Sequence, residues 1–97
     1  MNDQQSIKKA IECFQKAIKR DPQNAEGYYN FGVFYSLQRE FNQAAACFKK
    51  AIEINPNYID AHYELGLAYA EQGDFDQARK CCKKVNELDG AYTIIHN

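Results

Sequence analysis

The chain has 97 residues, of which 45% are hydrophobic, and a formal net charge of −1. A chain of this length forms one modest domain that buries about 60 to 65% of the surface exposed by its unfolded state, and its balanced charge does not indicate a polyanionic partner such as nucleic acid or an anionic membrane. No apolar run approaches the roughly 20 residues that span a bilayer, and the first residues lack the apolar middle of a secretory signal, so we expect a cytoplasmic protein without a membrane partner.

The hydrophobic residues recur with a helical period from the first segment onward. Ile7, Ile11, Phe14 and Ile18 are spaced by three or four residues, which places them on one stripe of an amphipathic helix. No stretch alternates as a strand does, so the expected fold class is all-α. The predicted helices cover residues 4–20, 24–37, 41–54, 58–71 and 75–88.

Two of the predicted turns contain proline. Pro22 and Pro56 each follow a helix and cannot continue it, because proline lacks the backbone N–H and clashes with the preceding turn. Asn24 and Asn57 follow these prolines and are available to cap the next helix.

The other two turns occupy matching places, at Arg39 and Gly73. Gly73 readily takes the positive φ that ends a helix, and Asp74 followed by Gln77 resembles an N-cap with its partner three residues on. Arg39 makes the earlier turn less regular than the later one.

A period of 34 residues links these elements. Cys13, Cys47 and Cys81 are 34 residues apart, and residues 25–58 share 12 of 34 positions with residues 59–92. A period of this size indicates stacked structural units. Residues 6–24 match only the second half of a unit.

The residue types within one unit resemble the signature of the tetratricopeptide repeat. The matching residues are Tyr28, Phe31, Gly32, Tyr35, Ala44, Phe48, Ala51 and Pro56. The resemblance implies antiparallel helix pairs stacked into a right-handed superhelix. It divides the chain into the second helix of a truncated repeat (6–24), two full repeats (25–58 and 59–92) and the start of a further helix (93–97).

Small residues of the signature have a packing role. Gly32 and Gly66 let the second helix of each pair approach the first, and Ala44, Ala51 and Ala78 stand where a larger side chain would force the pair apart. The last repeat departs from the pattern after this point, with Cys82, Val85 and Gly90 in the places of Phe48, Ala51 and Pro56.

The resemblance also implies a protein-binding module whose first helices line a concave groove. All 12 Lys and Arg residues lie outside residues 24–38 and 58–72, so the predicted groove is acidic and lined by tyrosine. Such a groove suits an extended or helical peptide segment that is cationic or neutral. The groove residues are Glu26, Tyr29, Asn30, Val33, Leu37, Asp60, Tyr63, Glu64, Leu67 and Glu71.

Two other interpretations of this surface exist. Exposed Tyr and Glu residues are common on helices that merely need a polar outer face. One subgroup of the family holds the terminal carboxylates of heat-shock chaperones, and this chain resembles that clamp at Asn30. Asp60 and Glu64, however, occupy places where the clamp has Lys and Arg, and they would repel a carboxylate.

No catalytic, metal or cofactor site is predicted. Cysteines in successive stacked repeats lie beyond the roughly 7 Å Cα separation that a disulfide allows, and His62 and His96 are not spaced as zinc ligands with them. His62 replaces Tyr28 and is expected to pack.

The chain has no glycine-rich phosphate loop and no nucleophile beside a histidine. Lysines follow the predicted backs of the helices without interleaved aromatic residues, which does not favour RNA.

The chain ends suggest an alternative function in self-assembly. The first helix lacks a partner before it, so Ala10 and Ala17 are expected to face an absent neighbour, while Phe14 and Ile18 pack toward the next helix. Copies of the chain, or further repeats of a longer array, are the candidates to cover these ends. The predicted self-association residues are Ile7, Ala10, Ile11, Ala17, Ile94 and Ile95.

Overall fold

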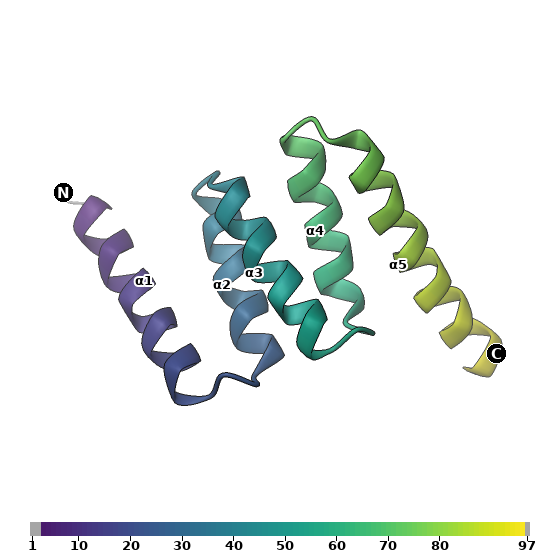
Figure 1. The fold of residues 1–97 in the computed structure, drawn as a ribbon, viewed down its shortest axis with the longest axis horizontal. Helices are drawn as coiled ribbons and strands as arrows, with labels where there is room; N and C mark the ends of the chain where they lie inside the picture. The colour runs from purple at the N-terminus through teal and green to yellow at the C-terminus, as the bar shows by residue number, and fades with distance from the viewer. Residues whose placement is uncertain (1–2, 97) are drawn as a thin grey trace.

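The computed structural model describes residues 3–96, and the side chains of residues 3–90. Its five helices are α1 (Asp3–Arg20), α2 (Ala25–Leu37), α3 (Phe41–Ile54), α4 (Ile59–Glu71) and α5 (Phe75–His96). They stand side by side in chain order, each roughly antiparallel to the one before (Figure 1). The result is an elongated stack of 49 × 32 × 20 Å, and residues 3–96 contain no strand.

An aromatic contact joins α1 to α2. The ring of Phe14 stacks on Phe31 with centroids 5.1 Å apart and lies 5.6 Å from the ring of Phe34. Ile18 borders a hollow that Tyr28 and Phe31 also line. The expected packing of Phe14 on the second helix is therefore confirmed, and Ile18 faces the same helix across this hollow.

The core lies where α2, α3 and α4 meet. Ala44, Phe48 and Ala51 of α3 are fully buried, and Leu65 of α4 belongs to the same apolar cluster. Burying a Phe or Leu side chain stabilises a fold by about 1.5 to 3 kcal/mol, so this cluster contributes a large part of the stability. Gly32 lies so close to the Phe48 ring that a Cβ at Gly32 would meet it, which confirms the role assigned to this glycine.

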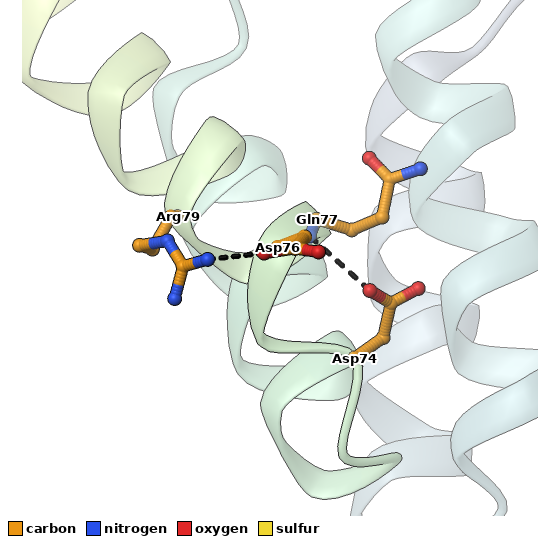
Figure 2. Close-up of polar contacts among 4 residues, drawn as sticks. All are labelled: Asp74, Asp76, Gln77 and Arg79. Carbon is orange, nitrogen blue, oxygen red and sulfur yellow. Dashed lines mark hydrogen bonds and ion pairs between the residues drawn. The ribbon is translucent and has the colours of Figure 1, made fainter.

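Three local turn signals have the expected structure. Asn24 accepts a hydrogen bond from the Gly27 backbone N–H at 3.2 Å and caps α2. Gly73 has a φ of 80°. Asp74 accepts from the Gln77 N–H at 3.2 Å, as Figure 2 shows at the start of α5, so an N-terminal donor that lacks an intrahelical acceptor is satisfied. The Asp74 N–H donates to the Tyr69 oxygen rather than to the Gln77 side chain, so only the Asp74 half of the expected reciprocal cap is confirmed.

The turn before α4 differs from the prediction. Asn57 does not cap the helix, because α4 begins at Ile59 and the capping position is Tyr58, which makes no side-chain capping bond. The backbone N–H of Asn57 instead donates to Asn55 Oδ1 at 3.2 Å. Asn55 thus supplies the side-chain bond that stabilises this turn.

The C-terminal boundary was also predicted wrongly. α5 continues from Phe75 to His96, so residues 93–96 extend this helix rather than start a further one. Gly90 occupies the place that Pro56 has in the preceding repeat. Inside a helix, proline costs about 3 kcal/mol relative to alanine and glycine only about 1 kcal/mol, so Gly90 weakens the helix without ending it. The side chains of Ile94 and Ile95 lie outside the described ones.

His62 is buried, with 8% of its surface exposed. Its Nε2 lies 2.8 Å from the carbonyl oxygen of Pro56. The ring therefore fills the place of Tyr28 and links α4 to the turn before it, which confirms the predicted packing role.

Candidate functional site

The predicted groove residues come from α2 and α4, two helices that contain no Lys or Arg. Leu37, Tyr63 and Leu67 are the large apolar side chains exposed on them, at 75%, 56% and 47%. Glu26, Asn30, Asp60 and Glu71 are also exposed, whereas Tyr29, Val33 and Glu64 are half-buried. The surface thus combines carboxylates with accessible apolar groups.

At the N-terminal ends of α2 and α4, two tyrosines lie among carboxylates. The rings of Tyr29 and Tyr58 have centroids 5.1 Å apart. Burial raises the pKa of both phenols, and the charges of Glu64 and Asp60 raise the pKa of Tyr29 further. Glu26 and Asp60 act in the same direction on Tyr58. We call these five residues the acidic-aromatic cluster.

Among the carboxyl groups of this cluster, that of Glu64 has a raised pKa. Burial raises the pKa of its carboxyl group, and the nearby Asp60 charge raises it further. Within residues 3–90, the ion pairs do not include Glu26, Asp60 or Glu64. A cation placed here would relieve both the desolvation and the repulsion.

The C-terminal ends of α2 and α4 border a second feature, a hollow of about 270 Å³. Arg39 Nη2 lies 3.5 Å from Glu71 Oε2, and the Arg39 guanidinium carbon lies 5.3 Å from the centre of the Phe41 ring. The hollow is lined by Ser36, Arg39, Phe41, Glu64, Leu67, Ala68 and Glu71. We call it the Arg39 corner.

The predicted groove residues therefore do not form one uniform surface. Glu26, Tyr29, Asp60 and Glu64 gather at one end, and Glu64, Leu67 and Glu71 at the other. Val33 packs on the buried core, and Tyr63 lines a separate apolar hollow between α4 and α5.

Three contributors to these clusters were not predicted from the sequence. Tyr58 precedes α4, while Arg39 and Phe41 flank the start of α3, so none belongs to the helix faces that the repeat pattern assigns to the groove. The sequence did contain a signal for Arg39, because it is a non-glycine residue in the place that matches Gly73; the structure gives it a positive φ of 61°.

The predicted self-association residues of α1 do not share one surface. Ile7 and Ile11 turn toward α2 and line a hollow with Phe34 and Tyr35. Ala10 is half-buried and Ala17 is exposed.

An apolar hollow lies between α4 and α5, with a volume of about 220 Å³. Its lining residues are Tyr63, Gly66, Leu67, Ala70, Ala78, Cys82 and Val85. In the preceding repeat the position of Cys82 is occupied by Phe48, which is fully buried beside Gly32 and Tyr29 of α2 and belongs to one apolar cluster with Leu65 of α4.

The four cysteines are free and differ in exposure. Cys13 and Cys82 are exposed, Cys47 is half-buried and Cys81 is buried. Burial raises the pKa of Cys47 to about 11. Among the described residues, no three potential metal-binding side chains gather in one place, and the described helices include none whose length and hydrophobicity would carry it across a membrane.

Several solved structures are similar to this chain. A crystal structure of MamA is 33% identical, with a TM-score of 0.86 over 91% of this chain, which spans about half (52%) of that protein. The complex of the TPR2B domain of yeast Sti1 with pHsp70 is 25% identical, with a TM-score of 0.82 over 91% of this chain and 70% of that one. The first TPR of Spaghetti (RPAP3), bound to the HSP90 peptide SRMEEVD, is 26% identical, with a TM-score of 0.82 over 90% and 69%.

No curated protein sequence matches the chain. Family profiles do match nearly its whole length. The profile described as TPR repeat matches residues 2–38 and 34–73, and the one described as tetratricopeptide repeat matches residues 59–90. Together with the five-helix stack, these matches show that the chain belongs to the tetratricopeptide repeat family.

Proposed function

We propose that this protein-interaction module binds a cationic or neutral peptide segment, extended or helical, along the groove of α2 and α4. The observation that carries the proposal is the acidic-aromatic cluster, in which Asp60 and Glu64 stand beside Tyr29 without a basic partner among the described residues. Lysine and arginine side chains offer both a charge for the carboxylates and a cation for the tyrosine rings.

The similar structures support peptide binding by this chain, but the HSP90 peptide bound in one of them differs in charge from the guest that we propose. The HSP90 peptide SRMEEVD bound to Spaghetti carries three acidic residues. Asp60 and Glu64 would repel such a peptide, since like charges a few ångströms apart disfavour each other. We therefore propose that the module selects against acidic C-terminal peptides.

No reaction is proposed, because the carboxylates stand on open helices where water is not excluded. The free thiols of all four cysteines are compatible with a reducing compartment, which supports a cytoplasmic location.

Fluorescence anisotropy with a labelled, amidated lysine-arginine peptide tests the proposal. Asp60→Lys combined with Glu64→Lys should weaken binding about 2- to 30-fold at low salt, which corresponds to about 0.2 to 1 kcal/mol for each charge. The loss should diminish as salt rises. Glu12→Lys with Glu87→Lys makes the same charge change at exposed positions outside the groove and serves as the control. Equal affinity of both double variants and the parent would contradict the proposal.

A second candidate function is end-to-end self-assembly, favoured by the hollow between α4 and α5. Cys82 and Leu67 are exposed there, whereas Phe48, which occupies the position matching Cys82, is fully buried. A second copy of the chain is the occupant we propose, since stacked repeats bury such faces against the next unit.

A further inference from the structure

Arg39 has a backbone conformation that its side chain disfavours. Its φ is 61°, in the left-handed region, while glycine occupies the matching position of the next turn with a φ of 80°. Both turns make the same backbone bond, from Glu40 N–H to Tyr35 oxygen and from Asp74 N–H to Tyr69 oxygen, each at 2.9 Å. The turn itself therefore does not require arginine, and strained residues of this kind often serve a site.

The guanidinium of Arg39 lies in the corner of the groove. It is 3.5 Å from the Glu71 carboxylate and 5.3 Å from the Phe41 ring centre. Leu67 and Glu64 line the same hollow. The hollow thus presents a carboxylate, an aromatic face and an apolar wall to one guanidinium, which is the full set of contacts that an arginine side chain uses.

The ion pair between Arg39 and Glu71 is weak enough for a guest arginine to replace Arg39. The side chains of Arg39 and Glu71 are 74% and 49% exposed, and an exposed ion pair holds its partners weakly. A guest side chain entering from solvent meets no packed barrier there.

We propose that the Arg39 corner is a subsite for an arginine side chain of the bound peptide, and that Arg39 occupies it in the free protein as an intramolecular competitor. The inference rests on the proposed function, because it names the guest side chain at one end of that groove. Arginine is preferred over lysine, since a planar guanidinium stacks on Phe41 while it bonds the Glu71 carboxylate, and an ammonium group does one or the other less well.

The two ends of the groove set the spacing of the guest's charges. Asp60 and Glu71 are separated by 11 residues of α4, or about 16 Å along the helix axis. An extended peptide covers this distance in about five residues. A guest with arginines five residues apart therefore places one in the Arg39 corner and the other at the acidic-aromatic cluster.

The test uses a labelled peptide of glycine and serine, acetylated and amidated, with two arginines five residues apart. Arg39→Gly removes the competitor and leaves a residue suited to the turn, so the peptide should bind about 1.4- to 5-fold more tightly, the factor that corresponds to one exposed ion pair. Glu71→Gln, added to Arg39→Gly, should reverse this gain. A peptide with lysines in place of arginines should gain less from Arg39→Gly.

Arg79→Gln is the matched control for net charge. Arg79 pairs with Asp76 at the start of α5 (Figure 2). Neither residue belongs to α2 or α4, which carry the groove residues, so the loss of Arg79 should leave the Kd nearly unchanged. An equal gain from Arg79→Gln and Arg39→Gly would overturn the subsite, as would parent-like or weaker binding by a folded Arg39→Gly variant. Peptide binding that is absent from every variant would instead remove the proposed function, and this inference with it.

Discussion

A Cβ atom on Gly32 would lie 2.6 Å from Cε1 of Phe48, closer than real carbon atoms approach. Because Phe48 is fully buried between α2 and α4, its ring has no free space into which it can move. The absence of a side chain at Gly32 is thus what sets the distance between α2 and α3.

We predict that Gly32→Ala destabilises the fold. Overpacking of a core costs about 1 to 3 kcal/mol, and the better helix propensity of alanine offsets about 1 kcal/mol of that loss. The net decrease in the free energy of unfolding, measured by urea denaturation, should therefore reach up to about 2 kcal/mol. Gly90→Ala makes the same change in α5, where a Cβ meets nothing within 4 Å, and should increase stability by up to about 1 kcal/mol. The packing account fails if both variants gain stability.

A second prediction separates the strain at Arg39 from its ion pair. Arg39→Gly and Arg39→Ala both lose the contact with Glu71, but only glycine adopts a φ of 61° without steric cost. The glycine variant should be more stable than the alanine variant by about 1 kcal/mol, because a left-handed conformation costs an L-residue about 1 to 2 kcal/mol. Thermal denaturation of the pair measures the difference, and equal midpoints would contradict it.

Most of the fold was predictable because local signals agreed with one another. The ends of the first four helices follow from Pro22, Pro56, Gly73 and the 34-residue period, and the structure places these ends within about one residue of the prediction. The end of α5 was not predictable in this way, since Gly90 permits a helix to stop but does not force it to. Ile7 and Ile11 share the stripe of Phe14, and the structure accordingly turns them toward α2, so their expected role in self-association did not follow from the hydrophobic period.

The candidate site was predictable only in part, for a geometric reason. Sequence spacing assigns residues of a helix to a face, which brought Asp60, Glu64 and Tyr29 into the groove. Spacing does not show where a long side chain from a turn reaches, so the contact of Arg39 with Glu71 had to come from the structure.

The third prediction concerns pH. The pKa of Glu64 is raised by burial and by Asp60, so Glu64 takes up a proton at a higher pH than an ordinary glutamate does. Binding of an arginine peptide requires the carboxylate, and it should begin to weaken above pH 4.5, the ordinary value, as the pH falls from 7. Glu64→Gln should bind more weakly at pH 7 and flatten this part of the profile.

The same shift has the opposite sign for folding. A raised pKa means that the folded state holds the Glu64 proton more tightly than the unfolded state does. Glu64 therefore favours folding at low pH and loses this contribution as the pH rises through its folded pKa. Glu64→Gln should raise the free energy of unfolding at pH 7 relative to the parent. A variant that is less stable than the parent at pH 7 would show that the carboxylate makes a favourable contact instead.

A fourth prediction uses the cysteines to check the packing of α3. With a pKa of about 11, only about 0.1% of Cys47 is thiolate at pH 8, and the thiolate is the species that reacts with iodoacetamide. Exposed Cys13 and Cys82 should be alkylated first, and Cys47 and buried Cys81 much later, as peptide mass spectrometry would resolve. In urea all four should react at similar rates. Early modification of Cys47 in the folded protein would mean that this thiol is more accessible than its half-buried position in α3 implies.

The last prediction concerns the apolar hollow between α4 and α5. Cys82 is exposed at this hollow, so Cys82→Glu places a charge in it without disturbing the core. If copies of the chain associate through this face, the parent should show a mass that rises with concentration in light scattering. Burial of one large apolar side chain such as Leu67 contributes about 1.5 to 3 kcal/mol, so several apolar side chains must be buried together to offset the cost of association. Cys82→Glu should shift the chain to monomer, whereas Asn86→Glu, exposed on the same helix but outside the hollow, should behave as the parent does. A parent that stays monomeric over a hundred-fold range of concentration would exclude this assembly.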